Sequence, residues 1–269
     1  LLHMEHGFLC YQPSKDAPEV APPPSEKTGY ITFGCFNSLA KLSPTTVRMW
    51  AKILAKVSQS RLCLKDPRLS DETTTKQISN LLSQAGIPSD RIELQGFSAD
   101  HRSHMEAYHN IDIALDAFPY NGTTTTCESM WMGVPTVTLC GSAHASRVGY
   151  SLLHRLNLSQ WVAHSKDEYI EIAVKFANDR TARIELRTTL RDQMAASSLT
   201  NAELVTSDFE RCLERSWSTN EIAPELPPGS VWANNENGMA IAVPSDIFQM
   251  TTWVLTEQHD WFEDEIHFV

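Results

Sequence analysis

The chain lacks paired cysteines, an excess of basic residues and long apolar runs, and each absence narrows its class. Its six cysteines contain no CxxC pair, which argues against disulfides and favours a reducing, cytoplasmic location. The formal net charge of -11 leaves no basic stripe for a nucleic-acid backbone. No apolar run approaches the ~18 residues that a membrane span needs. We therefore expect neither nucleic acid nor a membrane among its partners.

The remaining composition is that of a folded domain with appendages. A length of 269 residues and a hydrophobic fraction of 42% allow one large domain with an ample core. The first residues resemble neither a signal peptide nor the start of a fold, so the chain is expected to come from the middle of a longer one. Residues 12–29 are rich in proline and charge, and they are expected to form a linker.

The most informative segment is residues 115–139, LDAFPYNGTTTTCESMWMGVPTVTL. After an apolar strand, Asn121 and Gly122 predict a turn, and four threonines then open a helix that ends near Gly133. A helix that begins directly after a strand presents unpaired N–H groups and the positive end of its dipole, which suits a phosphate. The threonine hydroxyls are expected to add donors and to cap the helix. Glu128 lies one turn into the helix, where its carboxylate is expected to reach a ribose hydroxyl of a bound nucleotide. This layout is typical of a nucleotide site.

Short apolar runs alternate with amphipathic stretches along residues 30–216. The runs predict strands at about 30–36, 61–65, 91–94, 112–117, 136–139 and 161–163. Helix-start signals lie between them, namely Ser43 before Pro44, Ser70, and Ser165 with Glu168 as a capping box. Strands that alternate with helices in this way predict an α/β fold with a doubly wound, parallel, Rossmann-like sheet.

Three polar turns follow strands of this predicted sheet, at residues 37–41, 97–104 and 120–128. Ligands of doubly wound sheets bind outside the carboxyl ends of the strands, and all three turns fall on that edge. We therefore predict that the functional site lies at this edge.

Two blocks of the sequence resemble a known family. They are GYITFGCFNSLAKLSP at residues 29–44 and HMEAYHNIDIALDAFPYNGTTTTCESMWMGVPTVTLCG at residues 104–141. Together they resemble the catalytic C-lobe of the O-GlcNAc transferase/SPINDLY glycosyltransferases, over roughly residues 7–216. These are GT-B enzymes that usually follow tetratricopeptide repeats, and the TTTTCES form is closer to the SPINDLY branch and its bacterial relatives than to the animal enzymes. The resemblance implies the nucleotide-binding C-lobe of a GT-B glycosyltransferase.

The tail carries a second resemblance. From Met239 the sequence is similar to the entry segment of an FkbM-type methyltransferase, without the glycine-rich S-adenosylmethionine loop that such enzymes carry later. The expected organisation is the end of an N-lobe with a linker at 1–29, the nucleotide-sugar-binding lobe at 30–218, a linker at 219–238 and the start of a methyltransferase-like segment at 239–269.

The first resemblance gives roles to individual residues. Lys41 matches the family lysine that contacts the diphosphate of the donor, where an ammonium neutralises charge on the leaving group. Thr123, Thr124 and Thr125 match the phosphate-facing turn, and Glu128 matches the acidic residue that holds the ribose hydroxyls. Each residue type also has a purely structural interpretation. Lys41 would be a solvated lysine, the threonines would be helix caps, and Glu128 would be a favourable glutamate in the first turn of a helix.

The resemblance also describes the nucleoside end of the site. Ser38 stands where the animal enzymes usually have a glutamine near the phosphates. His104 matches a histidine beside the nucleotide, His101 occupies a neighbouring position, and Ala99 is expected at the base pocket. A zinc site at His101, His104 and His109 is not expected, because their spacings of three and five differ from the i, i+4 pair of a zinc helix. Family members need no metal, and the chain has no DxD motif.

The resemblance implies an inverting transfer of a sugar from a nucleotide diphosphate, UDP-GlcNAc in the first place, to a Ser or Thr hydroxyl of a protein. Lys41 is the candidate catalytic residue. Acceptor binding is expected to need an N-lobe and repeats upstream, so the chain alone is expected to bind UDP weakly and not to turn over. Two alternatives stay open: an O-fucosyl or glucosyl transferase with another donor such as GDP-fucose, and a non-catalytic nucleotide-binding module.

Overall fold

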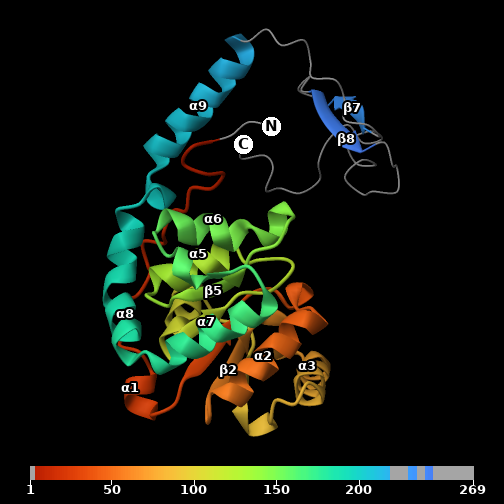
Figure 1. Cartoon of the computed structure of the whole chain (residues 1–269), viewed down its shortest axis with the longest axis vertical. Helices are drawn as coiled ribbons and strands as arrows, with labels where there is room; N and C mark the ends of the chain where they lie inside the picture. Colours follow the sequence, from red (N-terminus) through yellow and green to blue (C-terminus); the bar gives the residue numbers. More distant parts are fainter. Residues whose placement is uncertain (1–3, 219–229, 235–239, 245–269) are drawn as a thin grey trace. The chain divides into compact units, whose positions relative to one another are not determined.

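A computed structural model describes residues 4–218, 230–234 and 240–244. The chain forms two compact units, Leu1–Cys212 and Leu213–Val269. The larger unit contains a six-stranded, wholly parallel sheet in the order β3-β2-β1-β4-β5-β6. Figure 1 labels β2 and β5 of this sheet. Its strands are β1 Thr32–Cys35, β2 Arg61–Lys65, β3 Ile92–Gln95, β4 Ile113–Leu115, β5 Thr136–Leu139 and β6 Val162–Ala163. The predicted doubly wound sheet is confirmed.

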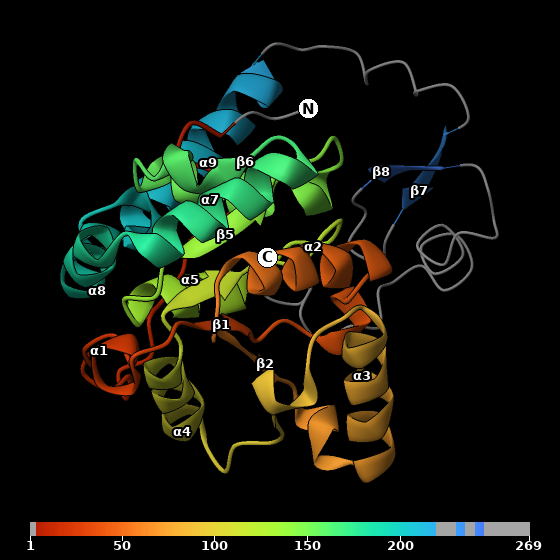
Figure 2. The same cartoon turned by 60° about the horizontal axis from the view of Figure 1, so that its bottom comes forward.

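Helices cover both faces of this sheet. Their bounds are α1 Ser25–Thr28, α2 Pro44–Lys56, α3 Glu72–Gln84, α4 His101–Glu106, α5 Thr124–Trp131, α6 Val148–Arg155, α7 Lys166–Asn178, α8 Arg180–Ala195 and α9 Ala202–Ser218. Helices α2 and α7 pack together on one face, and α5 lies on the other face with α8 against it (Figure 2). Strand order reverses between β1 and β4, and right-handed crossovers on either side of that point place helices on opposite faces.

Helix α2 illustrates how the sequence builds the core. The Ser43 hydroxyl accepts a hydrogen bond from the Thr46 amide, and Pro44 occupies the first helical position, as predicted. Trp50 and Ile53 on its inner face are fully buried, and each such side chain stabilises the fold by ~2 kcal/mol. The Trp50 indole N–H also donates to the Tyr169 hydroxyl of α7 at 3.2 Å. This bond fixes how the two helices lie against each other.

Two predicted helix starts are wrong, that of α3 by one residue and that of α4 by three. Asp71, not Ser70, caps α3, because Ser70 belongs to a preceding 3-10 turn and its hydroxyl accepts from the Phe97 amide instead. The sequence predicts a short helix at His104–His109, but α4 begins three residues earlier, at His101, because the Asp100 carboxylate caps it through the Ser103 amide. The earlier start puts His101 on the same helix as His104.

The segment 12–29, predicted as a linker, is held against the large unit. It contains the single helical turn α1, whose first amide donates to Asp112 at 3.0 Å. The Arg187 guanidinium of α8 donates to the Ala21 carbonyl, and that of Arg191 donates to the Pro18 carbonyl, both at 2.7 Å. The segment therefore packs as part of the lobe.

In the second unit, strands β7 Ser230–Asn234 and β8 Ala240–Pro244 form an antiparallel pair. The predicted linker 219–238 thus contains a strand, and most of the predicted methyltransferase-like segment lies outside the described residues. Among the described helices, none combines the length and the apolar character of a membrane span.

Candidate functional site

Lys41 lies at the carboxyl end of the sheet, in the turn after β1. Its ammonium donates to the Asn121 carbonyl at 2.9 Å and lies 4.1 Å from the centre of the Tyr120 ring. Lys41 is half-buried, and burial lowers its pKa while the nearby Asp116 carboxylate opposes that shift. The turns after β1 and β4, predicted to converge, therefore meet at this lysine.

The amino end of α5 faces the same rim. Thr123 occupies the N-cap position but makes no side-chain cap, so the predicted capping role of its hydroxyl is wrong. The Thr125 hydroxyl donates inward to the Asn37 side chain. Among the described residues, no hydrogen bond uses the backbone N–H groups of Thr124 or Thr125. Free N–H donors at the positive end of a helix dipole are the arrangement that suits an anion.

Glu128 lies one turn into α5 and is 6% exposed. One of its oxygens, Oε2, accepts from His104 Nε2 at 3.1 Å and from the Tyr108 hydroxyl at 3.2 Å. On the other side of the ring, His104 Nδ1 lies 2.9 Å from the Lys65 ammonium. The predicted pair of His104 and Glu128 therefore belongs to a buried chain of polar groups that also contains Lys65 and Tyr108.

A cavity of about 590 Å³ opens beside this chain. Four of its lining residues were predicted as site residues, namely Ser38, Ala99, His101 and His104. Phe97, 71% exposed, adds an aromatic wall. The His101 and His104 rings stack with their centres 6.1 Å apart. A larger cavity of about 810 Å³, beside Trp161 and Phe176, contains no predicted site residue.

The turn after β2 also borders the cavity, and sequence reasoning missed it. Arg68 donates to both oxygens of Asp66, at 2.8 and 2.9 Å, and to the Ser38 hydroxyl at 3.0 Å. Burial raises the pKa of Asp66, but the bonds from Arg68 and the Leu39 amide prevail and lower it to about 2. The sequence signal for this turn was its position, because Asp66 and Arg68 come just after the largely buried strand β2.

The three histidines considered for zinc do not share one place, because only the His101 and His104 rings stack and His109 bonds elsewhere. His109 Nε2 bonds to the Glu19 carbonyl at 2.9 Å, whereas His104 bonds to Lys65 and Glu128. Their ring nitrogens therefore serve separate partners.

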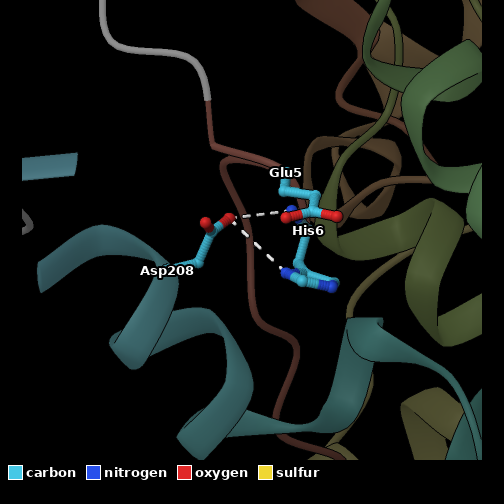
Figure 3. Close-up of side chains that lie close together, drawn as sticks. All are labelled: Glu5, His6 and Asp208. Carbon is cyan, nitrogen blue, oxygen red and sulfur yellow. Dashed lines mark hydrogen bonds and ion pairs between the residues drawn. The ribbon is translucent and has the colours of Figure 1, made fainter. Parts of the chain in front are cut away.

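One group of three side chains in the described part of the chain could hold a metal: Glu5, His6 and Asp208 (Figure 3). The His6 amide donates to Asp208 Oδ2 at 2.8 Å, and His6 Nδ1 lies 3.6 Å from the same oxygen. Arg155 donates to the Glu5 carbonyl at 3.5 Å, and Asp208 raises its pKa against the effect of burial. The bond from the His6 amide to Asp208 ties the N-terminal segment to α9.

The sheet and its rim define the nucleotide-binding lobe of a GT-B glycosyltransferase. The profile of Glycosyl transferase family 41 matches residues 26–209. The chain belongs to this family.

Individual relatives agree with this assignment. A probable UDP-N-acetylglucosamine–peptide N-acetylglucosaminyltransferase SPINDLY from Petunia hybrida is 42% identical over 81% of the chain and 23% of its own length. A UDP-N-acetylglucosamine–peptide N-acetylglucosaminyltransferase from Caenorhabditis elegans is 31% identical over 77% of the chain and 17% of its own length. A solved point mutant of the Thermobaculum terrenum O-GlcNAc transferase superposes with a TM-score of 0.73 at 33% identity, over 80% of the chain and 41% of that protein. The chain thus spans about a quarter of the curated relatives' length.

Proposed function

We propose that this chain is the donor-binding lobe of a protein O-glycosyltransferase, acting within a longer chain. Its donor is a UDP-sugar, UDP-GlcNAc in the first place, and the acceptor is a Ser or Thr hydroxyl of a protein. The observation that carries the proposal is the bond from the Lys41 ammonium to the Asn121 carbonyl, in the turn that leads into the free amino end of α5. A cavity large enough for a nucleoside borders the turn in which Lys41 lies. The peptide transferase named for the relatives supports the reaction class.

The chemistry of this site is stabilisation of a leaving group. In an inverting transfer the bond from the sugar to the diphosphate breaks, and negative charge grows on the diphosphate. Lys41 uses one N–H for the Asn121 carbonyl, which leaves two for phosphate oxygens. The dipole of α5 adds positive potential at the same place. These two sources perform the task that a divalent cation performs elsewhere, so we propose a reaction without a metal.

The nucleoside end follows from the same geometry. Because His104 and Tyr108 occupy Oε2 of Glu128, its Oε1 is the oxygen that would receive a ribose hydroxyl. The base would enter the cavity lined by Ala99, His101 and Phe97. We propose that the phosphates, the ribose and the base of the donor occupy these three places.

Isothermal titration of the chain with UDP tests the proposal. Replacing Lys41 with Ala removes an ammonium that bonds to the diphosphate, and we expect UDP affinity to fall about tenfold to a hundredfold. Lys52→Ala, at an exposed lysine of α2, is the matched control and should leave affinity unchanged. Titration with GDP in parallel decides the base. Equal UDP affinity in wild type and Lys41→Ala, or no UDP binding by the wild type, would contradict the proposal.

A further inference from the structure

Lys65 is a buried lysine to which the proposed function assigns no contact with the donor. It is the last residue of β2 and is 6% exposed. Among the described residues its ammonium bonds to His104 Nδ1 at 2.9 Å, and no carboxylate lies within ion-pair distance of it. Burial lowers the pKa of Lys65, which the Glu128 carboxylate partly offsets. Burying an ammonium without a carboxylate partner is costly, so its retention needs a reason.

The bond from Lys65 decides how the His104 ring is protonated. A protonated lysine only donates, so His104 Nδ1 must accept, and its proton resides on Nε2. Nε2 can then donate to Glu128 Oε2 at 3.1 Å. A single chain of hydrogen bonds therefore runs from Lys65 through His104 to Glu128. It orients the ring and the carboxylate together.

Lys65 also borders the cavity itself. Its ammonium has three N–H groups, and one of them is used by His104, which leaves two donors at the cavity wall. The aromatic ring of Phe36 lies near, with its centre 6.0 Å from the ammonium. The cavity thus offers donors from Lys65 and apolar ring faces, and the acceptor Glu128 is bonded to His104, one of its lining residues. Those features complement a nucleoside, which has acceptor oxygens, hydroxyl donors and a flat base.

We propose that Lys65 is a nucleoside-binding residue: its ammonium donates to an acceptor oxygen of the ribose or base and holds His104 in the orientation that serves Glu128. The proposal rests on the proposed nucleotide site. It assigns Lys65 to the nucleoside. Lys41, which bonds to the Asn121 carbonyl, is instead assigned to the diphosphate. The two lysines should therefore respond differently to ligands with and without a nucleoside.

Comparing UDP with inorganic pyrophosphate tests this division. Lys65→Met keeps the apolar stem and removes the charge, so we expect UDP to bind about tenfold to a hundredfold more weakly while pyrophosphate affinity stays within twofold of wild type. Lys65→Arg retains donors and should recover part of the loss. Lys76→Met, at an exposed lysine of α3 paired with Glu72, is the matched control and should change neither affinity. Equal loss for both ligands, or for neither, would overturn the assignment.

Lysine acylation of the wild-type chain supplies a test that needs no variant. UDP should protect Lys65 from acylation, whereas pyrophosphate should protect Lys41 alone, as read by mass spectrometry of the peptides. If calorimetry shows that the chain binds UDP but UDP does not slow the labelling of Lys65, the inference is refuted. The proposed nucleotide site would be unaffected by that result. A wild-type chain that binds neither ligand would instead remove the proposed function on which it rests.

Discussion

Asp116 shows how one residue organises the proposed phosphate end of the site. It follows β4, is 2% exposed, and accepts hydrogen bonds from the Asn37 side chain, the Gly122 amide and the Thr138 hydroxyl at 2.7–3.0 Å. These donors come from the turn after β1, the turn before α5 and β5. A carboxylate beneath an anion site disfavours the anion electrostatically, so its value lies in holding the turns in place. Burial raises the pKa of Asp116 to about 6.

This raised pKa predicts a specific pH dependence of stability. Below about pH 4 the Asp116 carboxyl is protonated in both the folded and the unfolded chain, and between about pH 4 and 6 it is protonated only in the folded chain. The free energy of unfolding therefore contains a contribution of about 2 to 3 kcal/mol that is present at low pH and lost as pH rises through 6. Asp116→Asn cannot titrate, so wild type should gain stability relative to this variant as pH falls from near 7 to near 4.5. Urea unfolding at both pH values measures the difference.

A constant difference between the two proteins across this range would show that Asp116 does not titrate there. Asp192→Asn, at an exposed residue of α8, is the control and should give unfolding curves that track the wild type at both pH values.

At the scale of elements, the turn before α5 depends on the absence of a side chain at Gly122. A Cβ there would lie 2.6 Å from the Thr126 hydroxyl and 2.8 Å from that of Thr125, with Asn37 nearer still. Such contacts push the turn away from Asp116 and displace the free N–H groups of α5. We expect Gly122→Ala to weaken UDP binding at least about tenfold, measured by calorimetry.

The control for this change is Gly86→Ala. Gly86 ends α3 with φ of 94° and has open space around its Cα, so alanine there costs about 1 kcal/mol of stability without touching the site. UDP affinity lost equally in both variants would trace the effect to stability and contradict the steric argument.

Local signals decided which elements could be predicted from the sequence. Ser43 with Pro44, the apolar runs of β2 and β5, and the threonines of α5 are local patterns, and the structure confirms the elements that they predict. Ser70 failed because two neighbouring polar residues, Ser70 and Asp71, both suit an N-cap, and the choice depends on the preceding turn. The role of Lys65 could not be predicted, since its partner His104 lies 39 positions away.

At the scale of the whole unit, the site is assembled from segments far apart in the chain. The turns after β1, β2, β3 and β4 contribute Lys41, Arg68, Ala99 and the start of α5, and the parallel order of the sheet brings them to one edge. A ligand that contacts all four turns binds the folded unit and not the unfolded chain. It therefore stabilises the unit as a whole by an amount that grows with its concentration.

This assembly lies within the unit Leu1–Cys212, which predicts the effect of two truncations. A chain ending at 218 keeps every site residue and the whole sheet, and we expect its unfolding midpoint and its UDP affinity to match those of the 269-residue chain. A chain ending at 200 loses Asp208, whose carboxylate accepts from the His6 amide of the N-terminal segment. Removing that acceptor should lower the free energy of unfolding by about 1 to 3 kcal/mol. Thermal unfolding with and without UDP measures the stability and the ligand response of both truncated chains. A lower midpoint for the chain ending at 218 would mean that residues 219–269 stabilise the lobe.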